Sequence, residues 1–290
     1  MVERLLSLLI VPVLLSYVAI SSVGGATNDF APGSAPPRSN YTWTLRVISE
    51  KEIENLFKKD KDLSVSASLR ILAKLNARDF DYIQQDINEG KPIRVPNDFT
   101  SFKSWTPLEK FIPGVADIPK FILIVKDLPY IGWYEKGRLV GDTYICVGKA
   151  ESTTDEGLYT VQEKDVEHVS KSYQNTFGEP APMPWALKIY GTVWIHAGDI
   201  AGGYCSHGCI NLPIFPAMSL FEWTDPGTPV LITDSLRTIP TVLAQNRSNC
   251  ALHASACNPN QKAVFPAGKQ TSGDNARHVT GSVSNPGDIL

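Results

Sequence analysis

The sequence has little excess charge of either sign and no internal repeat. Its 27 Lys and Arg residues against 30 Asp and Glu residues give a formal net charge of -3. A chain with this balance lacks the basic face that nucleic acid or an anionic membrane surface requires. We therefore expect no nucleic-acid partner.

The sequence also lacks an apolar run long enough to be an unambiguous membrane span. The run Leu5–Ile20 has about 16 residues, whereas a spanning helix needs roughly 20. Small residues follow it up to Ala26, as in a secretory signal. We predict that residues 1–26 are a signal peptide or an uncleaved anchor, and that the protein is exported to the periplasm or cell envelope. No cysteine follows the run closely, so we do not expect a lipid-modified N-terminal cysteine.

Cysteine is scarce and its count is odd. The five cysteines are Cys146, Cys205, Cys209, Cys250 and Cys257. Disulfides form in exported proteins, and an odd number leaves at least one thiol unpaired within the chain. Cys250 and Cys257 either pair with each other or both stay free.

The composition predicts a linker and then a small helical module. Residues 27–40 are rich in Gly, Pro and Ser, which is typical of a flexible tether. Within residues 41–117, Ser49 begins a capping box, and apolar residues between Val65 and Leu75 recur at helical spacing. Asp79 is the expected N-cap of a third helix, which Gly90 ends.

From Phe121 the pattern changes to strands, so we predict a mainly β fold for residues 118–235. A Lys136-Gly137 turn joins two of the strands. The expected strands are Phe121–Val125, Tyr130–Glu135, Arg138–Val147, Gly157–Val161, Leu187–Ile195 and Val230–Thr233, with one helix, Ala217–Trp223. Residues 236–290 lack apolar periodicity and are expected to be a disordered tail.

The segment Ile195–Pro213 gathers two histidines and two cysteines in a Gly-rich loop after a strand. A cysteine thiol is mostly protonated at neutral pH, so a catalytic cysteine needs a histidine within hydrogen-bond reach. For Cys209 the candidates are His196 and His207, and spacing alone does not choose between them. Gly208 lets the backbone turn, so that successive N–H groups, including that of Cys209, form an oxyanion hole.

His196, nine intervening residues and then Ser206–Asn211 resemble the signature of the L,D-transpeptidase (YkuD) family. The resemblance covers roughly residues 118–235. It includes the segments Phe121–Val147, Thr154–Tyr159, Met183–Trp185 and Pro226–Val230. The fold that it implies is a β-rich sandwich with a cradle around the cysteine, preceded here by the helical module.

The resemblance implies a cysteine-dependent acyltransferase that acts on peptidoglycan stem peptides. Cys209 would attack the carbonyl between the third and fourth stem residues, with His196 as the general base. An amine of a neighbouring stem would resolve the acyl-enzyme and give a 3-3 crosslink. No metal or organic cofactor is implied, and carbapenem-type inhibitors acylate such cysteines.

The remaining site residues follow from the same resemblance. Ala197 holds His196 through its carbonyl. We assign Ala197 and Asn211 to the substrate-binding residues. His207 supports the loop, and Ser206 and Gly208 form the oxyanion hole or the loop.

The sequence departs from the family pattern in three places. Asn211 stands where many members have Arg, which affects how a substrate carboxylate is bound. Asp155 replaces the Pro of a common Thr-Pro-x-Gly segment. Cys205 lies four residues before Cys209, and a disulfide between these two would switch the enzyme off.

The helical module has two interpretations. Leu75-Asn76 and Ile93–Pro96 resemble the end of a LysM-type glycan-binding repeat, which predicts binding to glycan strands. The alternative is a helical spacer that holds the catalytic domain off the membrane.

Other hypotheses for the loop are zinc binding and a purely structural Cys209. The zinc ligands would be His196, Cys205, His207 and Cys209, although paired C-x2-C or H-x3-H spacings are absent. The rival functions are a hydrolase on the same scaffold, either an L,D-carboxypeptidase or an amidase, and a non-catalytic peptidoglycan-binding protein. We interpret His168, His253 and His278 as solvated surface residues.

Overall fold

The computed structural model describes residues 41–151 and 153–239. Predictions for residues 1–40 and 240–290, including the export signal, the linker, Cys250, Cys257, His253 and His278, concern residues outside this description. In the part of the chain that is described, no helix is both long and apolar enough to cross a membrane.

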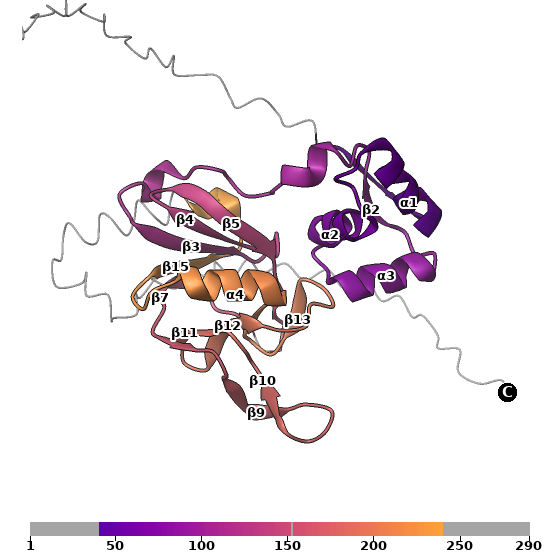
Figure 1. Cartoon of the computed structure of the whole chain (residues 1–290). Helices are drawn as coiled ribbons and strands as arrows, with labels where there is room; N and C mark the ends of the chain where they lie inside the picture. Colours follow the sequence, from indigo (N-terminus) through magenta and orange to yellow (C-terminus); the bar gives the residue numbers. More distant parts are fainter. Residues whose placement is uncertain (1–40, 152, 240–290) are drawn as a thin grey trace, which may run out of the picture. The chain divides into compact units, whose positions relative to one another are not determined.

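The N-terminal module is a two-stranded antiparallel sheet with three helices between its strands (Figure 1). Ser49 begins the first helix, where its hydroxyl accepts a hydrogen bond from the N–H of Glu52. The sequence predicted the helices and missed the strands, which are only four residues long. The elements are β1 (Trp43–Arg46), α1 (Glu50–Lys59), α2 (Val65–Asn76), α3 (Phe80–Asn88) and β2 (Ile93–Pro96).

A five-stranded sheet in the order β5-β4-β3-β15-β7 forms the centre of the fold. The last strand of the described chain, β15, lies parallel to β3 and antiparallel to β7. Figure 1 shows β15 in orange beside the magenta β3. The strands are β3 (Lys120–Val125), β4 (Tyr130–Glu135), β5 (Arg138–Tyr144), β7 (Gly157–Thr160) and β15 (Pro229–Thr233); the short helices η1 (Ser101–Ser104) and η2 (Pro113–Val115) precede them.

A second sheet, in the order β14-β12-β11-β8, carries the residues around the predicted nucleophile. Two strand pairs stand beside it, the hairpin β9–β10 and the parallel pair β6–β13. The remaining elements are β6 (Val147–Gly148), β8 (Glu163–Asp165), β9 (Val169–Gln174), β10 (Pro180–Pro182), β11 (Ala186–Tyr190), β12 (Val193–Ala197), β13 (Tyr204–Ser206), β14 (Ile210–Leu212), α4 (Ile214–Trp223) and η3 (Leu236–Thr238).

Strand β3 is buried on both faces because two hydrophobic cores lie on its opposite sides. Successive side chains of a strand point to opposite faces. Ile122 and Ile124 enter the core shared with the second sheet and α4. Phe121 and Leu123 belong to the core that also contains apolar residues of α1, α2 and α3. The helical module and the central sheet therefore share one core.

The mainly β prediction is confirmed by the strands and sheets of the described residues, with local corrections. The run Leu187–Ile195 is two strands, because the chain turns at Gly191, whose φ is +49°. Helix α4 begins at Ile214, before the expected start at Ala217. Pro216 is tolerated there because the first turn of a helix needs no N–H partner. At the start of the expected disordered tail, residues 236–238 form η3.

Candidate active site

Cys209 lies in the short loop between β13 and β14. Strand β14 runs parallel to β12, and their register pairs Asn211 with His196. The chain therefore brings the end of β12, which carries His196, next to the segment that carries Cys209. Asn211 also exchanges two backbone hydrogen bonds with Cys146, at 2.8 and 3.0 Å.

Buried hydroxyl groups fix the conformation of the Cys209 loop. The Ser206 Oγ accepts the N–H of Gly208 at 3.1 Å and donates to the Cys209 carbonyl at 2.5 Å. Thr154, which is 1% exposed, donates to the Gly208 carbonyl and accepts the N–H of Gly148, both at 2.9 Å. Gly208 has a φ of +114°, a region that L side chains rarely adopt. The conformation of the loop therefore depends on Ser206, Thr154 and Gly208.

The Cys209 thiol is half-buried and free. Burial raises its pKa above the usual value, and a hydrogen bond from the backbone N–H of Trp194 opposes this effect. The thiol lies 3.7 Å from the carbonyl oxygen of Thr192, to which its proton can be donated. At neutral pH the sulfur is therefore protonated, and it needs a base before it can act as a nucleophile.

His196 has the properties of such a base. It is 7% exposed, and its Nδ1 lies 2.8 Å from the carbonyl oxygen of Ala197. Because a carbonyl only accepts, Nδ1 carries the proton, and Nε2 of the neutral ring is left as a proton acceptor. Burial lowers the pKa of His196 to about 4; the bond to Ala197 opposes this shift, and the nearby His168 adds to it.

Cys209 and His196 line the same cavity, which has a volume of about 460 Å³. Among the described residues no direct hydrogen bond joins them. Both pKa shifts favour the neutral pair over a thiolate and an imidazolium. The cavity is thus lined by a neutral thiol and a neutral base, so proton transfer would accompany attack on a substrate.

His207 lines the cavity at a different position. It is exposed, and its ring stacks on Tyr173 of β9 with 4.3 Å between the ring centroids. It thereby connects the Cys209 loop to the β9–β10 hairpin. This contact agrees with a supporting role, whereas the buried His196 is the better candidate for the base.

His168 is a site residue that the sequence did not reveal. We predicted it to be a solvated surface residue, which is wrong. It is half-buried, lines the cavity and stacks on Trp194 at 3.9 Å. Its Nδ1 lies 3.0 Å from Asp165 Oδ2. The polar sequence around it carries no signal that would have identified it.

The other predicted site residues differ in their access to the cavity. Asn211 and Ser206 line it. Ala197 is 5% exposed and is not among the lining residues, so its contact is with His196. The Gly208 N–H is engaged by Ser206, which leaves the N–H of Cys209 as the loop's candidate oxyanion donor.

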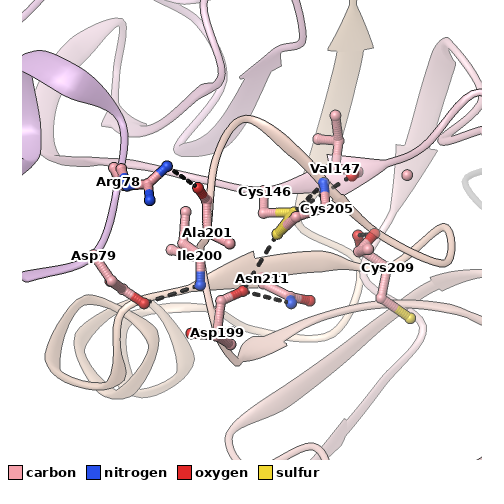
Figure 2. The surroundings of a disulfide bond; sticks show 12 residues. Arg78, Asp79, Cys146, Val147, Asp199, Ile200, Ala201, Cys205, Cys209 and Asn211 are labelled. Atoms are coloured by element: carbon pink, nitrogen blue, oxygen red, sulfur yellow. Dashed lines mark hydrogen bonds between the residues drawn. A yellow bond between two sulfur atoms is a disulfide. The ribbon is translucent and has the colours of Figure 1, made fainter. Parts of the chain in front are cut away.

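Cys205 forms a disulfide with Cys146, with 5.6 Å between their Cα atoms. The alternative that the sequence left open, a disulfide between Cys205 and Cys209, is therefore not formed. The cause is the parallel pairing of β13 with β6, which places Cys205 beside Cys146. In Figure 2 the Cys209 side chain points away from this disulfide.

The zinc hypothesis fails for the same reason, because the Cys205 thiolate that it needs does not exist in this disulfide. No group of three or more His, Cys, Asp or Glu residues in the described ranges could hold a metal ion.

Comparison with protein families matches residues 119–232 to the YkuD model, an L,D-transpeptidase catalytic domain. A search of curated proteins found no match. Among solved structures, the NMR structure of the catalytic domain of the Enterococcus faecium L,D-transpeptidase is 30% identical, with a TM-score of 0.33; the match covers 39% of this chain and 95% of that chain.

Two mycobacterial structures are also similar. An L,D-transpeptidase from Mycobacterium smegmatis is 19% identical, with a TM-score of 0.36; the match covers 39% of this chain and 58% of that chain. L,D-transpeptidase 3 from Mycobacterium tuberculosis, in complex with a faropenem-derived adduct, is 18% identical, with a TM-score of 0.37; the match covers 40% of this chain and 60% of that chain. This chain thus spans less than two thirds of either mycobacterial protein.

Proposed function

We propose, on the premise that residues 119–232 belong to the L,D-transpeptidase (YkuD) catalytic-domain family, that this protein forms 3-3 crosslinks between peptidoglycan stem peptides. The nucleophile is Cys209 and the general base is His196. The observation that carries the proposal is that both line one cavity, the first as a free thiol and the second as a histidine whose Nδ1 proton is donated to a carbonyl.

In the first step Cys209 attacks the carbonyl between the third and fourth residues of a tetrapeptide stem. A bond forms between Sγ and the carbonyl carbon while the thiol proton passes to His196 Nε2. The C–N bond then breaks, and the terminal amino acid leaves with that proton. General base catalysis of this kind contributes roughly 10² to 10⁴ in rate.

In the second step an amine of a neighbouring stem attacks the thioester. His196 takes a proton from the amine and returns it to the departing Cys209 sulfur, so the enzyme is restored. The N–H of Cys209 is the donor that we assign to the oxyanion in both steps, because Ser206 already occupies the Gly208 N–H. Asn211 lines the cavity as a substrate contact.

We also place the protein in the periplasm or cell envelope, anchored or released at its N-terminal segment. Support comes from the Cys146–Cys205 disulfide, because disulfides persist in oxidising compartments outside the cytosol. Peptidoglycan lies in the same compartment.

The test is to incubate the full chain with tetrapeptide muropeptides and follow the products by mass spectrometry. Cys209→Ala removes the nucleophile, and Cys209→Ser is the matched variant that keeps the shape with a poorer nucleophile. We expect crosslinked dimers with the wild type alone. Cleavage without dimers would favour the hydrolase, and products that persist in Cys209→Ala would overturn the role of this cysteine.

A further inference from the structure

We infer that Asp79, at the N-terminus of α3, is a positioning residue of the active site. It holds the loop of residues 198–201, and this loop holds the carboxamide of Asn211 in the cavity. The kinetic part of this inference rests on the proposed function, whereas the structural part does not.

Asp79 and Ile200 exchange two hydrogen bonds. The backbone N–H of Asp79 donates to the Ile200 carbonyl at 2.9 Å, and the Ile200 N–H donates to Asp79 Oδ2 at 2.9 Å. Figure 2 shows the second of these bonds. The other carboxylate oxygen accepts the hydroxyl of Tyr144 at 3.1 Å. Both oxygens are thus used, one for the loop and one for the central sheet.

The carboxylate of Asp79 does not cap its own helix. An Asp at the N-cap normally accepts an N–H of its own helix, but this side chain makes no such bond in α3. The sequence pattern predicts the helix start correctly and gives no hint of the second role. Capping is therefore not the reason that the structure needs a carboxylate at this position.

Neighbouring residues of the helical module hold the same loop. Arg78 donates to the Ala201 carbonyl at 2.9 Å, and the Tyr82 hydroxyl donates to Asp199 Oδ2 at 2.6 Å. Arg78 is itself paired with the buried Asp86 at 3.0 Å. Three consecutive loop residues, 199 to 201, are therefore bonded to the start of α3.

The position of the loop in turn sets the orientation of Asn211 in the cavity. The Asn211 carboxamide donates to the Asp199 carbonyl at 3.0 Å (Figure 2). The loop begins directly after the β12 residues His196 and Ala197, and the Gly198 N–H donates to the Leu212 carbonyl at 3.0 Å. If the loop moves, the Asp199 carbonyl moves, and Asn211 loses the acceptor that sets its orientation.

The first experiment measures amide hydrogen exchange of Ile200 in the full chain, without substrate. In Asp79→Ala we expect exchange to rise about tenfold or more, because the acceptor is lost. Asp79→Asn keeps an oxygen for this N–H and should exchange like the wild type. Asp81→Ala removes the same charge from the first turn of α3 and is the matched control. Unchanged exchange in Asp79→Ala would overturn the inference.

The second experiment is a double-mutant cycle with Asn211→Ala, measured as kcat/KM for a tetrapeptide donor. In the wild-type background, Asp79→Ala should lower kcat/KM about tenfold. In the Asn211→Ala background, the same substitution should change kcat/KM by less than about twofold. Equal effects in both backgrounds would show a merely structural role and overturn the inference. Asp79→Asn should restore kcat/KM.

Asp79→Ser provides a second route if Asp79→Ala does not fold, because serine is a good N-cap residue with a shorter reach. Asp79→Ser should raise the amide exchange rate of Ile200 as Asp79→Ala does. An exchange rate equal to that of the wild type would contradict the inference. Absence of any Cys209-dependent product in the wild type would refute the proposed function alone, since the exchange results stand without it.

Discussion

At the residue scale, burial sets the protonation states of the active site. It raises the pKa of the Cys209 thiol and lowers that of His196. A resting thiol resists oxidation better than a thiolate does, so burial protects the Cys209 sulfur. The neutral histidine is at once in the form that accepts a proton. Reactivity then depends on substrate binding to align the Cys209 thiol with the His196 ring.

The first prediction concerns the pH dependence of stability through His196. Its pKa falls from 6.5 in the unfolded chain to about 4 in the fold. Between these values the unfolded chain binds more protons, so this contribution to the free energy of unfolding is complete above pH 6.5 and is lost as the pH falls towards 4. The loss is about 3 kcal/mol, at ~1.4 kcal/mol per pKa unit.

Urea unfolding of the wild type and His196→Gln from pH 4 to 7 checks this prediction. The difference between their unfolding free energies should shrink as the pH falls. His207→Gln, at an exposed histidine, should keep the wild-type pH dependence. An equal slope for His196→Gln and the wild type would contradict the assignment.

The second prediction concerns Thr154, whose hydroxyl joins Gly208 to Gly148. Thr154→Val keeps the shape but leaves a buried N–H and a buried carbonyl without this partner, which costs about 1 to 3 kcal/mol. We also expect Cys209 acylation to slow by about tenfold as the loop loosens. Thermal unfolding and carbapenem acylation rates measure the two effects.

The matched control is Thr153→Val, at the exposed neighbouring position. It should leave both the unfolding temperature and the acylation rate near those of the wild type. If the two variants behave alike, the hydroxyl bridge of Thr154 does not matter.

The sequence alone points to a candidate site where chemistry and spacing coincide. Cys209, His196 and His207 lie within one short segment, and a thiol close to two histidines in a Gly-rich loop is typical of a nucleophile beside its base. Thr154 and His168 reach the site only through tertiary packing, since β6 and the second sheet bring them there. The Cys146–Cys205 pairing depends on strand pairing in the same way.

At the element scale, long apolar strands were predictable and short polar ones were not. Strand β3 has a continuous apolar run because both of its faces are buried. The strands β9 and β10 expose most of their residues and have no alternating pattern. In β13 and β14, three residues each, no period can be recognised. Tertiary contacts decide these elements.

The third prediction tests the packing of β5 on β4. A Cβ on Gly141 would lie 2.1 Å from the ring of Trp133, which is nearly buried and cannot move freely. Gly141→Ala should therefore destabilise the protein by about 1 to 3 kcal/mol. At Gly202 a Cβ would meet nothing within 4 Å, so Gly202→Ala is the control and should be nearly neutral. Equal urea midpoints for both variants would contradict the close packing of the two strands.

At the scale of the whole molecule, the shared core decides how the chain unfolds. Apolar residues of α1, α2 and α3 belong to the same cluster as Phe121 and Leu123 of the central sheet. A spacer that merely separates the catalytic domain from a membrane would need no such core. Together with the bonds from Arg78, Asp79 and Tyr82 to residues 199–201, this packing joins the module and the sheets in one folded unit.

The fourth prediction is that the helical module and the sheets unfold in one transition. Leu72 of α2 is fully buried in the shared core, so Leu72→Ala should cost about 2 to 5 kcal/mol. The loss should appear equally in far-UV circular dichroism, which follows the helices, and in near-UV signals, which follow the aromatic side chains of the sheets. Leu45→Ala, at a β1 side chain that is 62% exposed, should change neither. Two separate transitions, with only the helical one shifted by Leu72→Ala, would mean that the module is an independent spacer. A single shifted transition would mean that the helical module cannot be separated from the Cys209 site without loss of stability.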